Sequence, residues 1–230
     1  GKTDQLIIKE LVKSYFFFFF EIDFDIEFIE EQPTSDKTSG GGWGMVYKWC
    51  LSNPPQERNA IYFGRGLFAN DMDGLACDGL LIHLDSDICE EIGALTSLSP
   101  VPSKAASPEL RGKFIKRVIE EWLWPEKTEQ TGKHIIVPAV EAIEAWLVAG
   151  LSDDEINPES NHNIQKRLAE LDHTVVRKVA IPANLSRPRK DIQNYQKILA
   201  VAKLKSSQIA DKCPHFKTML DEIFVAAVTA

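Results

Sequence analysis

The 230 residues are 44% hydrophobic, which is enough apolar material to bury a full α/β core, and one domain is the default expectation at this length. The chain carries 34 acidic against 26 basic residues, a formal net charge of -8, which excludes a free-standing DNA-coating protein and requires any polyanion to meet a local basic patch, a metal ion or a partner. The four cysteines lack CxxC spacing, and neither a signal peptide nor a bilayer-length apolar run is recognisable, which predicts a cytoplasmic protein without structural zinc or membrane contact.

The first 28 residues predict a helix followed by a strand. The helix begins near Thr3, which can cap it, because apolar residues recur from there at helical spacing. From Phe20 to Phe28, apolar and acidic residues alternate, which is the pattern of a half-buried strand with its acidic stripe in solvent. The apolar positions of the helix are Leu6, Ile7, Leu11, Val12 and Tyr15.

The next segment is dominated by loops. The stretch QPTSDKTSGGG at 32–42 lacks the lysine and the strand-to-helix frame of a phosphate-binding Walker loop, so we interpret it as a flexible loop. Residues 43–49 follow as a short helix or strand, and Pro54 and Pro55 make 52–66 irregular.

The stretch GLLIHLDSDI at 79–88 predicts a buried strand that ends in two carboxylates, Asp85 and Asp87. His83 lies within the strand and shares a face with Asp85, so we expect a core or supporting histidine rather than a ligand. A short helix over 90–98 follows.

Later elements are mostly helical. An amphipathic helix over 110–123 ends before Pro125, and a compact strand occupies 134–137. Pro138 then opens a helix over 139–148, for which Gly150 is the expected stop. Further helices are predicted at 164–171, 191–204 and 216–228. Strands and helices alternate early and helices dominate late, which favours an α/β sheet with a helical C-terminal elaboration (about 150–230) inside one domain, 1–230.

The two aspartates suggest a metal site. Side chains at the carboxyl end of a strand in an open α/β sheet project into the crevice where ligands bind. In an extended segment Asp85 and Asp87 share a face, where two like charges repel unless a cation lies between them, and a hard ion such as Mg²⁺ suits such oxygens. The alternative is structural, with Asp87 accepting backbone N–H bonds as the cap of the following helix.

Two motifs carry a family resemblance. Gly1-Lys-Thr-Asp4, which opens the first helix, and Leu84-Asp-Ser-Asp87, which ends the strand, resemble the TOPRIM domain of topoisomerases, primases and OLD-family nucleases. The resemblance implies a Rossmann-like, mostly parallel sheet with helices on both faces. It also implies that Asp85 and Asp87 hold Mg²⁺ or Mn²⁺, while a glutamate directly before the glycine acts as general acid and base; the printed sequence begins at that glycine.

A second resemblance involves the later helices. PAVEAIEAWL at 138–147 and CPHF at 213–216 look like TOPRIM-related proteins of bacterial phage-defence loci, which are often encoded beside an ATPase. Glu141 and Glu144 lie three residues apart and share a helical face, so one or both could complete the acidic metal cluster, with Glu144 taking a catalytic role. The alternative is a pair of solvated glutamates near a helix N-terminus.

Candidate contacts for a phosphodiester come from three places, one of which is the basic group Arg111, Lys113, Lys116 and Arg117. The N-terminus of the first helix, with Gly1 and Lys2, would direct its positive dipole end at the same crevice. Arg187, Arg189 and Lys190 form the densest basic cluster, although lysine and arginine on exposed surfaces are usually just solvated.

The resulting functional hypothesis is a metal-dependent endonuclease, or a related phosphoryl-transfer enzyme, of an anti-phage defence system. Its implied partners are nucleic acid, DNA most of all, and an ATPase subunit. The main alternative is a catalytically silent TOPRIM-like module that binds nucleic acid or nucleotide, which the net acidity favours. A DxD glycosyltransferase and a haloacid-dehalogenase phosphatase are weaker alternatives, because little chain remains for an acceptor site and Ile88 follows Asp87 where that phosphatase has threonine.

Overall fold

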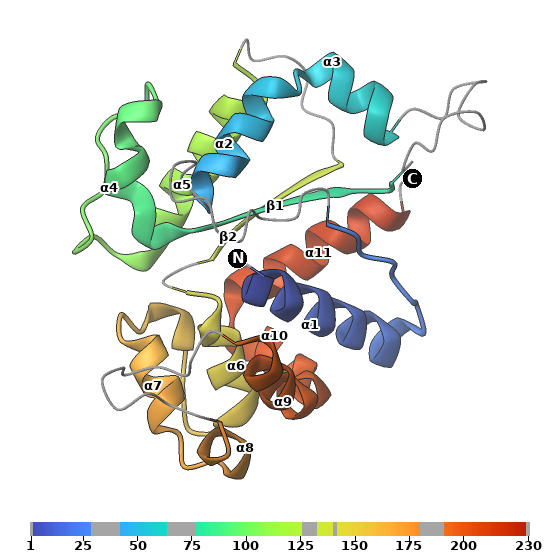
Figure 1. The fold of residues 1–230 in the computed structure, drawn as a ribbon, viewed down its shortest axis with the longest axis vertical. Coiled ribbons are helices and arrows are strands. Elements are labelled where there is room, and N and C mark those ends of the chain that lie inside the picture. The colour runs from blue at the N-terminus through green and yellow to red at the C-terminus, as the bar shows by residue number, and fades with distance from the viewer. Residues whose placement is uncertain are drawn as a thin grey trace. The chain divides into compact units, whose positions relative to one another are not determined.

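The structure is a computed structural model that describes residues 2–28, 42–63, 77–125, 133–139, 142–179 and 191–228. The chain forms two compact units, the first from residues 1–32 and 139–217 and the second from 33–138 and 218–230 (Figure 1). Each unit is therefore assembled from segments that are distant in sequence. Compactness does not measure independent folding, so a single domain over 1–230 stays a prediction.

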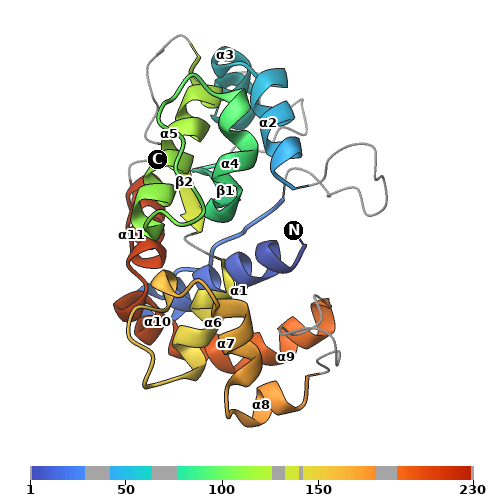
Figure 2. The same ribbon diagram turned by 90° about the vertical axis from the view of Figure 1, so that its left-hand side faces the viewer.

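The first unit is helical in its described part. Its α-helices are α1 (Lys2–Phe20), α6 (Glu144–Leu151), α7 (Ile164–Glu170), α8 (Thr174–Arg177), α9 (Ile192–Ala202), α10 (Ser206–Lys212) and the start of α11 (Pro214–Val228). Short 3-10 helices occupy Pro158–Ser160 and Lys203–Lys205. The helix α6 packs against α7, α9 and α10 (Figure 2), and all eight of its residues are buried. A helix that is apolar on every side belongs at the centre of a bundle, and the sequence EAWLVAGL has that character.

The helix predicted near Thr3 is confirmed, but the strand over 20–28 is wrong. α1 continues through Phe20, and residues 21–28 have no regular secondary structure. Glu21 then takes a left-handed conformation with φ of 56°. Its N–H donates to the Phe17 carbonyl at 3.1 Å. The alternating pattern by itself does not make a strand, because a strand needs a partner for its backbone groups.

The second unit is a mixed α/β structure. Its α-helices are α2 (Trp43–Ser52), α3 (Pro55–Arg58), α4 (Cys89–Ile92), α5 (Pro108–Leu123) and the remainder of α11. A π-helix follows α3 at Asn59–Phe63, and 3-10 helices flank α4 at Ser86–Ile88 and Gly93–Leu95. The described strands, β1 (Leu80–Asp85) and β2 (His134–Ala139), form a two-stranded sheet.

The two strands are parallel. The Leu80 N–H donates to the Lys133 carbonyl at 2.8 Å, and the His83 ring lies 3.0 Å from the Val137 carbonyl, so residue numbers rise together along both strands. Their carboxyl ends therefore meet at the same edge. Leu80, Ile82 and Leu84 are buried in one core with α5, while the alternate residues of β1 are half-buried.

The helix α5 is held by side-chain hydrogen bonds at both of its ends. Ser107 caps the helix by accepting the Leu110 N–H at 3.3 Å, and Pro108 occupies the first turn. At the other end, the buried guanidinium of Arg58 donates to the Leu123 carbonyl. The helix predicted at 110–123 is thus confirmed with an earlier start.

The region after β2 differs from the sequence prediction. Pro138 belongs to β2, α6 begins at Glu144 instead of 139, and Gly150 lies inside α6 instead of ending it. The coarse prediction, an α/β protein whose later part is helical, is confirmed. No helix in the described ranges is both long and apolar enough to cross a bilayer.

Candidate functional site

The two aspartates occupy different local structures in the second unit. Asp85 is the last residue of β1, at its carboxyl end, whereas Asp87 lies in the 3-10 helix Ser86–Ile88. Ser86 between them is fully buried. The shared face of an extended segment, which the sequence predicts for this pair, therefore does not apply, because the chain turns between the two carboxylates.

A histidine and an aspartate face one another at this edge. His83 Nδ1 lies 3.0 Å from the Val137 carbonyl oxygen, and because a carbonyl only accepts, Nδ1 carries the proton of the neutral ring. The other nitrogen, Nε2, lies 3.5 Å from Asp85 Oδ1. Both atoms are shielded from solvent, and the described part of the chain offers neither a hydrogen-bond partner. In the neutral ring a lone pair and a carboxylate oxygen thus point at one another, whereas in the protonated ring the same two atoms form an ion pair.

The separation of these two atoms fits a shared cation. Two ligands of one metal ion at about 2.1 Å lie roughly 3.0 Å apart at right angles and roughly 3.4 Å apart at a tetrahedral angle, close to the observed 3.5 Å. A histidine that donates its other N–H to a backbone carbonyl is the usual arrangement of a metal-binding imidazole. One imidazole nitrogen with carboxylate oxygens suits Mn²⁺ better than the strictly oxygen-seeking Mg²⁺.

Asp87 is surrounded by charges of both signs. Its pKa is raised, first by partial desolvation and then by the carboxylates of Asp85 and Glu91, while Lys104 and Arg111 act in the opposite direction. The side chain still reaches solvent, so water screens these interactions. A cation placed among these carboxylates would reverse their mutual repulsion.

The capping alternative for Asp87 has no support in the described hydrogen bonds. The residues that precede the 3-10 helix and α4 make no side-chain cap bond, and no described backbone N–H donates to the Asp87 carboxylate. Cys89, at the start of α4, donates its Sγ–H to the Ser86 carbonyl at 3.1 Å. Burial raises the pKa of this thiol to about 11, so Cys89 is not a thiolate nucleophile at neutral pH.

Glu144 lies in the first unit, away from any solvent. It begins α6, is 1% exposed, and accepts a hydrogen bond from the Tyr195 hydroxyl at 2.8 Å. Of the alternatives, a solvated glutamate at a helix N-terminus is therefore wrong. The carboxylate is built into the helical core, where Tyr195 of α9 is also fully buried.

Other predicted site residues divide into two groups. Lys2 is the exposed first residue of α1, in the first unit with Glu144. The remainder lie outside the described residues, namely Gly1, Glu141, Arg187, Arg189 and Lys190. Among described side chains, the structure brings together His83 and Asp85, with Asp87 close by.

Three neighbours of the aspartates were not predicted as site residues. The alternation of the strand places His83 on the face of Asp85, which was the available signal for it. Glu91 of α4 follows Asp87 by four residues, a helical spacing that was an available signal, whereas nothing in the sequence links Lys104 to Asp87, because Lys104 lies in a later loop. Within the described residues, no three His, Cys, Asp or Glu side chains gather closely enough to hold a metal ion.

Comparisons with protein-family models, with curated proteins and with solved structures found no match to this chain.

Proposed function

We propose that the carboxyl end of β1 binds a divalent cation, Mn²⁺ or Mg²⁺, and that the protein is a TOPRIM-like, metal-dependent nuclease of a phage-defence system. One observation carries the proposal. Two buried atoms that can act as metal ligands, His83 Nε2 and Asp85 Oδ1, face each other at 3.5 Å without a hydrogen-bond partner in the described chain. Leaving such groups unsatisfied costs stability, and a shared cation would satisfy both.

The protein residues have separate tasks in this proposal. His83 and Asp85 hold the cation, and the Val137 carbonyl keeps the His83 ring in the tautomer that leaves Nε2 free to bind. Asp87, whose pKa is raised, would take a proton from an attacking water. When bound, the cation would stabilise the charge that develops on a phosphoryl group. Lys104 and Arg111, which act on Asp87, add positive potential for the same group.

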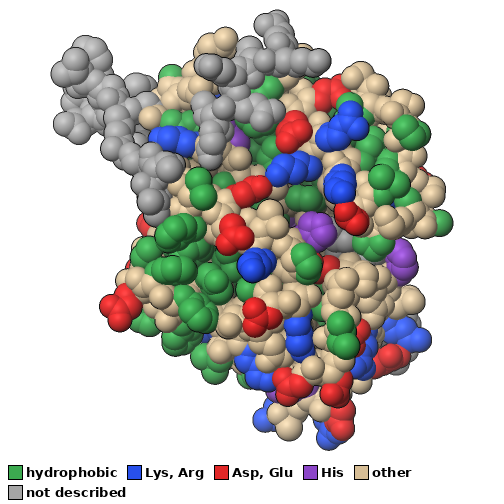
Figure 3. Space-filling view, turned by 180° about the vertical axis from the view of Figure 1, so that it is seen from behind, with side chains coloured by type: hydrophobic (Ala, Val, Ile, Leu, Met, Phe, Trp, Pro, Cys, Tyr) green, Lys and Arg blue, Asp and Glu red, His purple; other side chains and the backbone are tan. Residues whose placement is uncertain are grey.

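A silent binding module is the second candidate function. Its support is electrostatic: on the face in Figure 3, Lys and Arg side chains are interspersed with Asp and Glu instead of forming one basic surface. The buried Glu144 is held by Tyr195, which favours a structural part for that carboxylate. A module of this kind would bind metal and nucleic acid or nucleotide without cleaving a phosphodiester.

The experiment measures metal binding and cleavage on the full chain. We expect Mn²⁺ titration, followed by electron paramagnetic resonance, to show one tight ion, and Asp85→Asn to weaken it by at least about tenfold. Asp78→Asn is the matched control, since it makes the same change just before the amino end of β1. Binding that Asp85→Asn leaves unchanged would disprove the site. Cleavage of plasmid DNA or single-stranded RNA that needs the metal supports the nuclease, whereas tight metal binding without cleavage supports the silent module.

A further inference from the structure

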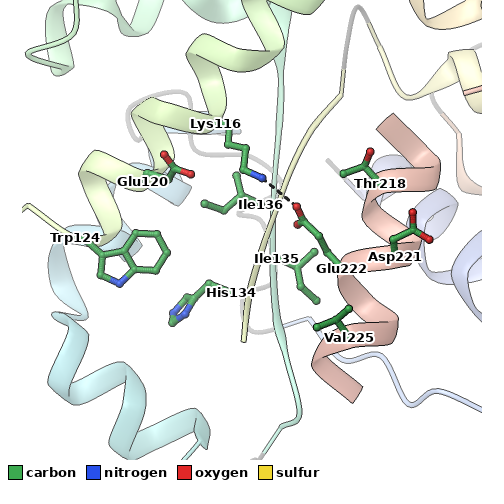
Figure 4. A pocket seen from close by; sticks show the side chains of 10 residues that line it. All are labelled: Lys116, Glu120, Trp124, His134, Ile135, Ile136, Thr218, Asp221, Glu222 and Val225. Carbon is green, nitrogen blue, oxygen red and sulfur yellow. Dashed lines mark hydrogen bonds and ion pairs between the residues drawn. The ribbon is translucent and has the colours of Figure 1, made fainter. Parts of the chain in front are cut away.

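The second unit contains a groove at the opposite end of the sheet from the aspartates. It runs along β2 between α5 and α11 and has a volume of about 440 Å³ (Figure 4). His134, the first residue of β2, lines it, whereas Asp85 ends β1 at the carboxyl edge. Pockets that hold small ligands fall in this range of volume. The groove is therefore large enough for a small ligand, and the proposed function gives it no role.

The inner surface of the groove consists of apolar side chains that are packed against one another. Ile135, Ile136 and Trp124 line it and are at most 6% exposed. The His134 ring packs edge-on against Trp124 at 5.2 Å and against Phe63 at 5.3 Å, which fixes the aromatic wall. Val225 of α11 contributes an exposed apolar side chain on the other side. These surfaces suit a flat apolar body.

The charges around the groove are mostly negative. Its one lysine, Lys116, forms an ion pair with Glu222 at 3.0 Å, so its charge is already matched (Figure 4). Glu120 on α5 and Asp221 on α11 also line the groove. In the described part of the chain no cation pairs with either of these two carboxylates. One lysine against three carboxylates leaves an excess of negative charge beside an apolar floor.

From this combination we infer that the groove binds a small molecule with an aromatic or apolar body and a protonated amine. The body would lie on Ile135, Ile136 and Trp124, and the ammonium group would interact with Glu120 on the α5 side, while Asp221 on the α11 side adds negative potential (Figure 4). The Trp124 ring adds a cation–π contribution for such a group. A carboxylate ligand of the same shape would meet like charges and be rejected.

The test compares two probes of similar shape and opposite charge on the full chain. We expect 2-phenylethylamine to bind in isothermal titration calorimetry and saturation-transfer NMR, and 3-phenylpropionate to bind at least about tenfold more weakly. The double variant Glu120→Gln/Asp221→Asn should lose about tenfold in affinity for the amine. The matched control is Glu109→Gln, also on α5, whose carboxylate pairs with Lys113 outside the groove.

A variant with the opposite sign separates ligand binding from mere stability. Lys116→Gln removes the cation that balances Glu222, so it should tighten amine binding several-fold, although it lowers or leaves unchanged the melting temperature. Val225→Trp should fill the groove and abolish binding. Equal affinity for the two probes, or charge variants that behave like Glu109→Gln, would overturn the inference.

Discussion

At the residue scale, similar carboxylates take different parts because their surroundings differ. Asp85 faces an imidazole nitrogen without a hydrogen-bond partner in the described chain, and Asp87 is exposed among like charges. Glu144 and Glu159 are buried and hydrogen-bonded. A carboxylate that repels its neighbours is suited to bind a cation, whereas one that accepts several hydrogen bonds holds the fold together.

The first prediction concerns Asp87→Asn. Desolvation and the Asp85 and Glu91 carboxylates raise the pKa of Asp87, so its ionised form disfavours the folded state. Without metal, the variant should melt slightly above wild type at pH 7. The gain should shrink as the pH falls below this raised pKa and vanish below the ordinary pKa of an aspartate, where Asp87 is protonated in both the folded and the unfolded chain.

Melting curves with EDTA at several pH values check this prediction. With saturating Mn²⁺ the order should reverse, since wild type gains more from the ion. The alternative of a helix cap predicts the opposite sign in EDTA, a loss of about 0.5–2 kcal/mol. A lower melting temperature in EDTA at pH 7 would therefore favour the cap.

The second prediction concerns Glu159, which is 3% exposed. Its Oε1 accepts the Trp146 Nε1–H at 2.9 Å and the Phe216 N–H at 3.3 Å, and its Oε2 accepts the His215 N–H at 3.0 Å. These hydrogen bonds connect the first turn of α11 to the 3-10 helix Pro158–Ser160. Glu159→Gln replaces one accepting oxygen with an NH₂ group, which would face an N–H donor instead of accepting from it. We therefore expect a loss of about 2–5 kcal/mol in the free energy of unfolding.

Urea denaturation measures this effect. The control is Glu170→Gln, because Glu170 and Lys166 form an exposed pair at 3.6 Å and such pairs contribute about 0–1 kcal/mol. Similar losses in the two variants would show that the buried network does not fasten α11.

At the scale of elements, close packing overrides local sequence preference. The glycine at 150 is a good helix stop in the sequence, yet α6 continues through Leu151. A Cβ at Gly150 would lie 3.1 Å from the Ala202 carbonyl oxygen and 3.1 Å from Ile209 Cδ1. Gly150 therefore serves a close approach between helices, which no helix-stop rule contains.

The third prediction is that Gly150→Ala destabilises the protein. Alanine improves helix propensity by about 1 kcal/mol, but overpacking against a backbone carbonyl costs about 1–3 kcal/mol. The control is Gly44→Ala in α2, where a Cβ would meet nothing within 4 Å, and which should stabilise or leave stability unchanged. Thermal melting compares the two, and a stabilised Gly150→Ala would contradict the packing described for α6.

At the N-terminal helix, too, tertiary contacts override the local sequence pattern, here the alternation over 20–28. Phe16 is fully buried, but Phe17 to Phe20 are 45–58% exposed. The Phe16 ring contacts Phe24 edge-on at 4.6 Å. The apolar side of 20–28 thus reaches the helix through a side chain, without a strand partner in the described chain.

At the scale of the whole molecule, chain order and spatial order differ. The first unit joins the N-terminal segment to residues 139–217, and the last residues, from Thr218, return to the second unit. There Gly79 lies against Ala226 and Ile135, because a Cβ at Gly79 would lie 3.4 Å from Ala226 Cβ and 3.2 Å from Ile135 Cδ1. The end of α11 is therefore part of the strand-bearing unit.

The fourth prediction follows from that return. A chain that ends after Lys217 loses the buried Leu220 and Ile223, each worth about 1.5–3 kcal/mol when fully buried, and the Lys116–Glu222 pair. We expect hydrogen exchange of the β1 and β2 amides to accelerate strongly, with much smaller changes in α9. Equal acceleration in both units would show that they unfold as one.

Much of the fold was predictable because its signals are local. The spacing of Ile7, Leu11 and Phe114, with their helical neighbours, identifies α1 and α5, and the alternation in LLIHLD identifies β1 together with the aspartate at its end. These patterns are read within one or two turns of chain, where side-chain period follows backbone geometry.

The tertiary structure decided what depends on distant partners. The Val137 carbonyl, 54 residues from His83, sets the tautomer that points Nε2 at Asp85, and Tyr195 makes Glu144 a buried acceptor. The groove along β2 likewise exists because α5 and α11 meet there through Lys116 and Glu222. The sequence by itself determined which residues carry charge and which segments are apolar. Only the folded chain decided which charges meet, because those distances depend on packing between segments far apart in sequence.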